Sequence, residues 1–337
     1  LLLIMKQILT VILVLSGLSS NAQVLQQRAV RLMGSRFDIT IVAKDSSAAN
    51  AYIDTVVAEV TRIEHLISDW MPHTQISEVN KNAGIKPVVV DKEVFELTER
   101  ALSFSEITEG AFDISFAAMD RIWKFDGSMT EMPTRKAIKN SVEKIGYKNI
   151  ILNKENSSIF LMKEGMKIGF GALGEGYAAD QCREMMIKKG VKAGIVNGSG
   201  DMNTWGKHPS GDPWKIGITN PIDDEEFLAV LSLVDEAAVT SGNYEKYVVF
   251  KGKRYSHIIN PKTGYPASGL SSVTVLGPSA EFANGLSTSV MVLGKRKGLK
   301  LIKSFPQYRG ILVDDSGRAI ATKNSGIDIQ SINSSSD

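Results

Sequence analysis

The second half of the chain is divided into many short apolar runs, and this division limits the possible folds more than any other feature. Between residues 193 and 275, short apolar or alternating runs are repeatedly interrupted by Gly, Pro, Asn and Asp. Such runs are typical of β-strands separated by turns. We therefore expect this half to consist mostly of strands, at residues 193–196, 214–219, 228–234, 247–250, 254–259 and 271–275.

Helical periodicity occurs on both sides of this strand-rich region. Apolar residues recur at helical spacing over 46–68 and 92–108, and Gly110 is a typical stop for the second helix. This mixed order favours an α+β protein with packed helices over regular βαβ winding. Further helices are predicted at 176–189 and 281–292, and further strands at 31–43, 150–152, 158–161, 167–170 and 309–314.

The N-terminal segment has the layout of a signal peptide. Lys6 precedes an apolar run from Ile8 to Leu18, and small and polar residues follow as far as Ala22. The run is too short to span a bilayer, and a buried N-terminal helix is the alternative reading. We predict a signal peptide at 1–22, cleavage after Ala22, export to the periplasm and no membrane span in the mature chain. The absence of a cysteine near Ala22 argues against a lipid anchor attached there.

The rest of the chain is expected to form one large domain, residues 23–330. No fixed-period repeat or low-complexity linker divides it, and the Ser-rich tail 331–337 is predicted to be disordered. The net charge is only +2, from 39 Lys and Arg against 37 Asp and Glu, without a dense basic stripe, so we expect no nucleic-acid partner. Because Cys182 is the one cysteine, an intramolecular disulfide and a cysteine metal cluster are excluded.

Three glycine-rich or polar regions are candidates for a binding site. Residues 169–180 run through several glycines into a helix, where free N–H groups favour phosphate oxygens. A tight turn with a close helix–sheet contact explains the same pattern. Residues 196–203 and 240–247 combine hydroxyls, amides and glycines, which suit either a polar ligand or ordinary turns. In the third region, 255–264, His257 precedes a Pro-Lys-Thr-Gly turn and is either catalytic or structural.

Considered together and in order, these regions resemble the ApbE family of FAD:protein FMN transferases. The resemblance extends from about residue 31 to about residue 314. It implies a single large, T-fold-related domain of mixed, mostly antiparallel sheets with packed helices. The motifs that carry it are Met33-Gly-Ser35, Ser68-Asp-Trp70, Gly110-Ala-Phe-Asp-Ile114, Gly174-Glu-Gly-Tyr-Ala-Ala-Asp180, Ser199-Gly-Asp201, Thr240-Ser-Gly-Asn-Tyr244, Ser256-His-Ile-Ile-Asn-Pro-Lys-Thr-Gly264, Ser272-Val-Thr-Val275 and residues 283–294.

The resemblance implies an exported, magnesium-dependent enzyme with FAD as substrate. Such enzymes cleave the pyrophosphate of FAD, release AMP and leave FMN esterified to a threonine or serine hydroxyl of a partner flavoprotein. Typical acceptors are exported subunits of sodium-pumping NADH:quinone reductases and of Rnf-type electron-transport complexes. Some relatives instead hydrolyse FAD to FMN and AMP, so an FAD pyrophosphatase is an alternative reading.

The resemblance also assigns site residues. It implies that His257 is the base that takes the proton of the acceptor hydroxyl, a role suited to a side chain with a near-neutral pKa. Metal ligation falls to the backbone carbonyl of Gly174 and to Asn284, Ser287 and Thr288, and on a helix Asn284 and Thr288 share one face. The implied FAD contacts are Met33, Trp70, Ala111, Phe112, Asp113, Gly171, Tyr177 and the backbone of Ile259.

Asn284 departs from the family pattern, which usually has aspartate at this position. An amide oxygen keeps the geometry of a ligand but removes a negative charge from a hard-cation site. Asn284 then either binds magnesium weakly once FAD phosphates complete the shell, or leaves a flavin-binding protein with poor transfer. The Asn-Gly pair at 284–285 offers a third possibility, since deamidation regenerates a carboxylate. Substitution of Asn284 by aspartate should raise turnover sharply if the metal site is limiting.

Overall fold

An eight-stranded antiparallel sheet forms the centre of the molecule in the computed structural model, which describes residues 23–223, 226–244 and 246–322. The predicted signal peptide and the predicted disordered tail lie outside these residues. Every neighbouring pair in the sheet is antiparallel, which confirms the predicted mostly antiparallel α+β architecture. The strands lie in the order β1 (Val24–Leu32), β2 (Ser35–Ala43), β6 (Ala193–Gly198), β7 (Asp201–Trp205), β10 (Ala237–Gly242), β13 (Leu270–Gly277), β14 (Arg309–Asp314) and β15 (Ala319–Ala321).

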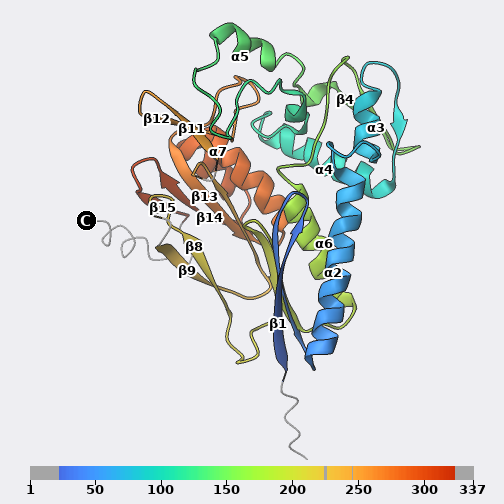
Figure 1. Ribbon diagram of the computed structural model, residues 1–337, viewed down its shortest axis with the longest axis vertical. Coiled ribbons are helices and arrows are strands. Elements are labelled where there is room, and N and C mark those ends of the chain that lie inside the picture. Colours follow the sequence, from blue (N-terminus) through green and yellow to red (C-terminus); the bar gives the residue numbers. More distant parts are fainter. Residues whose placement is uncertain (1–22, 224–225, 245, 323–337) are drawn as a thin grey trace, which may run out of the picture.

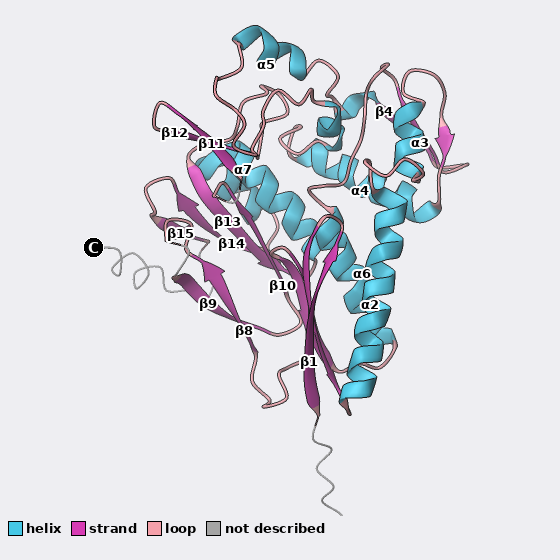
Figure 2. Cartoon of the chain, viewed as in Figure 1, coloured by secondary structure: helices cyan, strands magenta, loops and turns pink. Residues whose placement is uncertain are grey.

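Three long helices cover one face of this sheet (Figure 2). They are α2 (Ser46–Ile67), α6 (Gly174–Lys188) and α7 (Ala280–Lys303), with α6 packed against both of the others. Their apolar stripes face the sheet because the spacing of the buried residues matches the helical repeat. In α2, for example, Ile53, Val56, Val60 and Ile63 are fully buried. The main core therefore lies between the helical layer and the sheet.

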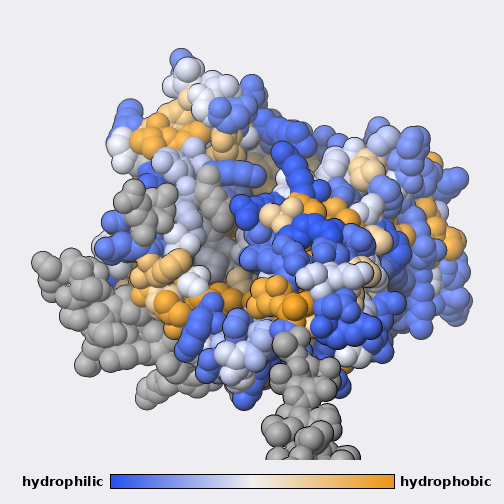
Figure 3. Space-filling model, turned by 60° about the horizontal axis from the view of Figure 1, so that its bottom comes forward, coloured by the Kyte–Doolittle hydropathy of each residue, from blue (hydrophilic) through white to orange (hydrophobic). Residues whose placement is uncertain are grey.

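The hairpin of β8 (Trp214–Thr219) and β9 (Phe227–Leu233) packs against the opposite face of the sheet (Figure 1). Leu231 and Leu233 of β9 meet Ala238, Leu276 and Ile311 of the central sheet in a second, smaller core. The outer side of the hairpin leaves some apolar side chains exposed. In Figure 3, one face of the molecule is largely hydrophilic, with apolar surface confined to separate patches.

The remaining elements gather at one end of the two layers, at the top of Figure 1. A three-stranded sheet of order β3-β5-β4 lies there, together with a two-stranded ribbon, β11 and β12. The bounds are α3 (Gln75–Lys81), β3 (Val88–Val89), α4 (Lys92–Ile107), η1 (Ile114–Ala118), α5 (Arg135–Ser141), η2 (Tyr147–Asn149), β4 (Ile150–Asn153), β5 (Ser158–Leu161), β11 (Tyr247–Phe250) and β12 (Lys253–Ser256).

The single strand predicted at 31–43 is wrong, because the chain turns back within it. Strand β1 ends at Leu32, and β2 pairs with it from Ser35 onward. The two intervening residues, Met33 and Gly34, have φ values of 52° and 77°. Positive φ at both central residues is the geometry of the two-residue hairpin turn that matches the twist of the strands. This turn places Met33 at the end of the sheet nearest α6.

The strand predicted at 167–170 is also wrong. The side chain of Asn80 replaces a strand partner there: its Oδ1 accepts from the Ile168 N–H at 2.8 Å, and its Nδ2 donates to the Ile168 carbonyl at 2.9 Å. The strand predicted at 254–259 ends at Ser256, so His257 lies in the following loop. Helix α7 continues to Lys303, past the predicted end at 292, with a kink at Gly294.

Strands β1, β7, β10 and β15 of the central sheet are not among the predicted elements, whereas β2, β6, β13, β14 and the long helices are. Both β7 and β10 carry polar residues that face the site, so they lack a clear apolar pattern. Among the described residues, no helix is long and apolar enough to cross a membrane.

Candidate active site

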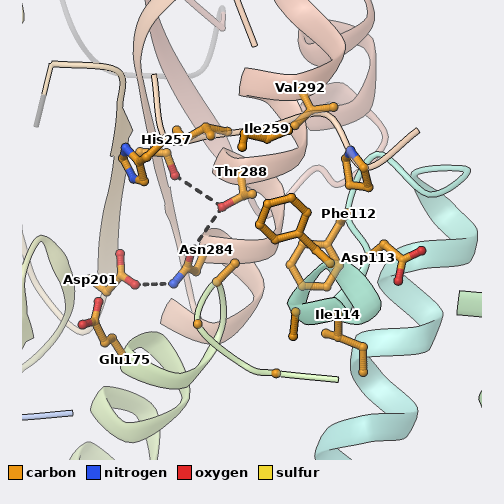
Figure 4. A pocket seen from close by; sticks show the side chains of 18 of the residues that line it. Phe112, Asp113, Ile114, Glu175, Asp201, His257, Ile259, Asn284, Thr288 and Val292 are labelled. Carbon is orange, nitrogen blue, oxygen red and sulfur yellow. Dashed lines mark hydrogen bonds between the residues drawn. The ribbon is translucent and has the colours of Figure 1, made fainter. Parts of the chain in front are cut away.

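A cavity of about 680 Å³ opens where the end of the central sheet meets α7 and the start of α6. Its walls come from distant parts of the sequence, as Figure 4 shows: η1 and the segment before it, the glycine-rich turn before α6, the β6–β7 turn, β10, the loop after β12, and α7. This volume is within the range of small-molecule binding sites. All three glycine-rich or polar regions singled out in the sequence contribute to the lining.

One wall of the cavity carries a cluster of side-chain oxygens. Asn284 and Thr288 lie one turn apart on α7, and Thr288 Oγ1 donates to Asn284 Oδ1 at 3.5 Å. Ser241 of β10 lies 3.5 Å from Thr288, measured between the hydroxyl oxygens. The Asn284 amide Nδ2 donates to the carboxylate of Asp201, at the start of β7 (Figure 4). The predicted pairing of Asn284 and Thr288 on one helix face is therefore present, and Asp201 and Ser241 join it.

His257 lines the same cavity, from the loop that follows β12. Its Nδ1 lies 3.2 Å from the carbonyl oxygen of Lys246. Because a carbonyl only accepts, this contact places the proton of the neutral ring on Nδ1 and leaves Nε2 as the basic nitrogen. Burial lowers the pKa of His257 below its ordinary value of 6.5, although the Lys246 carbonyl opposes the shift. At neutral pH the imidazole is therefore uncharged and able to accept a proton.

The other side of the cavity is formed by residues 111–117, including the predicted FAD contacts Ala111, Phe112 and Asp113. Phe112 presents an aromatic ring beside the cavity (Figure 4). The Asp113 carboxylate caps η1: Oδ1 accepts from the backbone and hydroxyl of Ser115 at 2.8 and 2.6 Å, and Oδ2 from the Tyr147 N–H at 2.9 Å. Burial raises its pKa. Asp113 thus fixes the shape of this wall, besides lining it.

A smaller hollow of about 60 Å³ adjoins the main cavity, and Asp69, Gly171 and Glu175 line both. It contains three further predicted residues, Met33, Trp70 and Gly174. The Trp70 side chain is 57% exposed, so its indole face is accessible to a ligand.

Two predicted site residues lie outside both hollows. The Tyr177 hydroxyl donates to Glu93 Oε1 at 2.7 Å on the other side of α6, and the Arg100 guanidinium lies over its ring. Ser287 is fully buried, and its hydroxyl donates to the Asn284 carbonyl at 3.0 Å and pairs with Ser241 at 2.8 Å. Ser287 therefore supports the oxygen cluster from behind. Ile259, by contrast, lines the main cavity as expected.

The sequence left open whether the glycines before and within α6 allow a ligand to approach the backbone or allow close packing, and the structure contains one example of each. Gly171 borders the cavity, and a Cβ there would meet no atom within 4 Å. At Gly176 a Cβ would lie only 2.6 Å from the carbonyl oxygen of Ala280, because α6 and α7 cross at this point. Gly171 therefore leaves the backbone accessible to a ligand, and Gly176 permits the close packing of α6 against α7.

Asp69, Glu175, Asp201, Ser241 and Lys246 line the cavity but were not among the predicted site residues. Carboxylate side chains outnumber cationic side chains in this lining, and its cationic side chain is that of Lys246. Glu175 is held by Ser35, whose hydroxyl donates to its Oε1 at 2.5 Å. Asp69, Glu175, Asp201 and Ser241 each lie inside one of the motifs Ser68–Trp70, Gly174–Asp180, Ser199–Asp201 and Thr240–Tyr244, which was their signal in the sequence. Lys246 lies in none of these motifs, and only its place within the polar region 240–247 pointed to it. Within the described ranges, no group of three or more His, Cys, Asp or Glu side chains is arranged to hold a metal ion.

Comparison with protein families gives a match over most of the chain. The model described as the ApbE family matches residues 33–312. A curated relative from Klebsiella pneumoniae (strain 342), named FAD:protein FMN transferase, is 29% identical over 291 residues, which cover 85% of this chain and 82% of the relative. A relative from Treponema pallidum (strain Nichols) with the same name is 28% identical over 312 residues, covering 88% and 86%.

Solved structures with the same fold include two ApbE proteins. The crystal structure of the ApbE protein from Thermotoga maritima has a TM-score of 0.81 and 28% sequence identity, and the match covers 89% of this chain and 97% of that one. The apo form of the Pseudomonas stutzeri flavinyl transferase ApbE has a TM-score of 0.77 and 25% identity, covering 89% and 94%.

Proposed function

Because the chain belongs to the ApbE family, we propose that it is an FAD:protein FMN transferase. The observation that carries the proposal is the placement of His257 in one cavity with the oxygen cluster of Asp201, Asn284 and Thr288. A base and a group of oxygens suited to a cation are the two parts that phosphoryl transfer needs from the protein.

In the proposed reaction, the acceptor is a threonine or serine hydroxyl of a partner flavoprotein. Its oxygen attacks the phosphorus atom of the FMN half of FAD, the bond from that phosphorus to the bridging oxygen breaks, and AMP leaves with the bridging oxygen. The hydroxyl proton passes to Nε2 of His257, which the Lys246 carbonyl leaves unprotonated. General-base assistance of this kind contributes roughly 10²–10⁴-fold to the rate.

The residues present fit magnesium. The donor set contains only oxygens, and Mg²⁺ prefers oxygen ligands, keeps several waters and binds substrate phosphates. The lining also carries more carboxylates than cations, so an anionic pyrophosphate would be repelled without a cation beside it. Asn284 and Thr288 would hold the ion from the main cavity, and the Gly174 carbonyl, the other proposed ligand, borders the adjoining hollow. When bound, magnesium neutralises charge on the pyrophosphate in the transition state.

The proposed binding mode of FAD uses both hollows. Phe112 borders the main cavity, while Met33 and Trp70 border the smaller one, so flat apolar rings find aromatic or thioether surface in either place. Gly171, which lines both, allows the backbone to approach the ligand between them. Tyr177 contributes indirectly, through its packing between α6 and α4.

The test combines the purified chain with FAD, MgCl₂ and an acceptor domain that carries a threonine. AMP release is followed by chromatography and the acceptor is weighed by intact-mass spectrometry. We expect AMP together with an acceptor mass increased by one esterified FMN. Peptide mass analysis of the same preparation establishes whether residue 284 is still asparagine.

His257→Gln tests the proposed base, and His208→Gln is its matched control because His208 lies in an exposed loop away from the cavity. We expect the first variant to lose transfer by at least 10²-fold and the second to retain it. AMP without a modified acceptor would indicate hydrolysis of FAD instead. Bound FAD with neither product would refute the proposed function.

The acceptor and the location of the reaction are also proposed. A signal peptide at 1–22 would place the enzyme in the periplasm, where exported subunits of NADH:quinone reductases or Rnf-type complexes would be its acceptors. N-terminal sequencing of the protein from a periplasmic fraction tests this. A mature chain that begins directly after Ala22 supports export, and an intact N-terminus in the cytoplasmic fraction contradicts it.

A further inference from the structure

Asp201 and Asn284 form a buried pair at the wall of the cavity. Asp201 is 6% exposed and Asn284 is 5% exposed, yet both line the cavity. The Asn284 Nδ2 donates to Asp201 Oδ2, and the Asn284 Oδ1 accepts from Thr288 Oγ1 (Figure 4). The pair joins β7 to α7, two elements that are 83 residues apart at this contact.

This pair fixes the direction of the amide. A carboxylate without its proton only accepts hydrogen bonds, so the amide nitrogen must face Asp201 and the amide oxygen must face away from it. The Asn284 oxygen is thereby directed toward Thr288, on the same wall of the cavity. A carboxylate oxygen has more than one lone pair, so Asp201 Oδ2 can accept the amide hydrogen and still approach a cation.

The pair also shows how an amide fits at position 284 beside a carboxylate. An aspartate there would place a second carboxylate in direct contact with Asp201, and two like charges in a partly buried site repel each other strongly. Such a pair would need a cation or a shared proton to be stable. With Asn284 the same wall is a hydrogen-bonded pair that carries a single carboxylate.

We propose that Asp201 supplies the carboxylate charge of the cation site in this chain, while Asn284 serves as a neutral oxygen ligand that Asp201 holds in position. The loss of charge at 284 is then compensated from β7. This inference rests on the proposed function, because it takes the oxygen cluster to be the magnesium site. It goes beyond that function by assigning the charged ligand to a residue on a different element.

Cation binding by the full chain, without FAD or acceptor, tests the assignment. Mn²⁺ serves as the probe, since free Mn²⁺ is measured directly by electron paramagnetic resonance, and thermal unfolding with and without MgCl₂ gives a second readout. Asp201→Asn, Asn284→Asp and the exchanged double variant are compared with the unmodified protein. The double variant keeps one carboxylate and one amide in contact, so it remains informative if a single variant folds poorly.

We expect Asp201→Asn to weaken Mn²⁺ binding by about 10- to 100-fold, the usual effect of losing a ligand or its supporting partner. The exchanged double variant should recover most of this loss. Asn284→Asp should unfold at a lower temperature than the unmodified protein without metal and gain more from MgCl₂, because the cation separates two carboxylates.

Asp69→Asn is the matched control. Asp69 lines the same cavity, so its substitution removes the same charge, but its neighbours are Gly169 and Ser77 instead of Asn284. It should change Mn²⁺ affinity much less than Asp201→Asn. Equal effects of the two substitutions would show that only the total charge of the cavity matters, and would overturn the assignment.

Unchanged Mn²⁺ affinity in Asp201→Asn, or the absence of binding by the unmodified protein, would also overturn the assignment. FMN transfer is measured separately with the same preparations. Transfer by a protein whose Mn²⁺ affinity does not depend on Asp201 would refute this inference and leave the proposed function standing. Absence of transfer together with Asp201-dependent binding would refute the proposed function alone.

Discussion

Replacement of Asp180 by alanine should loosen the junction between α6 and α7 and destabilise the whole protein. The Asp180 carboxylate, on α6, accepts from Ser279 Oγ at 2.6 Å and from the N–H groups of Ala280 and Glu281 at 2.8 and 3.1 Å. It also accepts from Asn203 Nδ2 of β7 at 2.6 Å. One side chain therefore caps α7 and joins it to α6 and to the central sheet.

The magnitude follows from these four contacts. Alanine leaves the N–H groups of Ala280 and Glu281 and the amide of Asn203 without this acceptor, and a buried polar group without a partner costs about 1–3 kcal/mol. Ser279 still caps the helix, since its Oγ accepts from the Phe282 N–H at 3.1 Å, and some water will enter. We expect a net loss of about 2–4 kcal/mol, which lowers the Tm by roughly 3–6 °C for a protein of this size.

Thermal and urea unfolding measure this loss. The matched control is Asp45→Ala at the start of α2, where an exposed aspartate makes one capping bond, to the Ala48 N–H at 2.7 Å. That substitution should cost about 1 kcal/mol, as exposed N-caps do. Equal losses for Asp180→Ala and Asp45→Ala would refute the argument that Asp180 joins the two helices and the sheet.

Three further predictions concern His257, Gly176 and Cys182. Transfer should decline as the pH falls through the lowered pKa of His257, because the base becomes protonated; folding stability should decline over the same range, since the unfolded state binds that proton more readily. A rate that stays constant from pH 7 down to the pH at which the protein unfolds would exclude His257 as the base. Gly176→Ala should destabilise by about 1–3 kcal/mol in urea unfolding, because its Cβ would lie 2.6 Å from the Ala280 carbonyl oxygen; an unchanged midpoint contradicts this. The Cys182 thiol is fully buried and its pKa is raised by burial, so iodoacetamide should label it only in denaturant, and labelling of the native protein would show an opening of the core.

The long helices and the apolar strands were predictable because their buried apolar residues recur at the spacing of a helix or a strand. In α2 the buried residues repeat at helical spacing, and in β2 Phe37, Ile39 and Ile41 alternate with neighbours that are less buried or face the other layer. Strands β7 and β10 were not predicted because they carry polar residues, some of which line the cavity, in place of an apolar pattern. The apparent strand at 167–170 misled for the opposite reason: it is apolar, but the Asn80 side chain satisfies its backbone.

The site was predictable where its residues share an element. Helical spacing alone places Asn284 and Thr288 on one face of α7, and both line the cavity. No local pattern brings Asp201 to Asn284, because that contact depends on how β7 and α7 pack. Tyr177 shows the same limit, since the direction of a helical side chain near a glycine-rich start depends on the crossing with neighbouring helices.

The walls of the cavity are contributed by segments far apart along the chain, and this has a kinetic consequence. The contact between Ser35 and Glu175 closes a loop of 140 residues, and the contact between Asp201 and Asn284 closes one of 83. Contacts of such long range are made only after the chain entropy of these loops has been lost, so they form late in folding. Because the residues that line the two hollows extend from Met33 to Val292, no short fragment of the chain contains the complete site. Retention of FAD by a preparation would therefore report that the entire domain has reached its native arrangement.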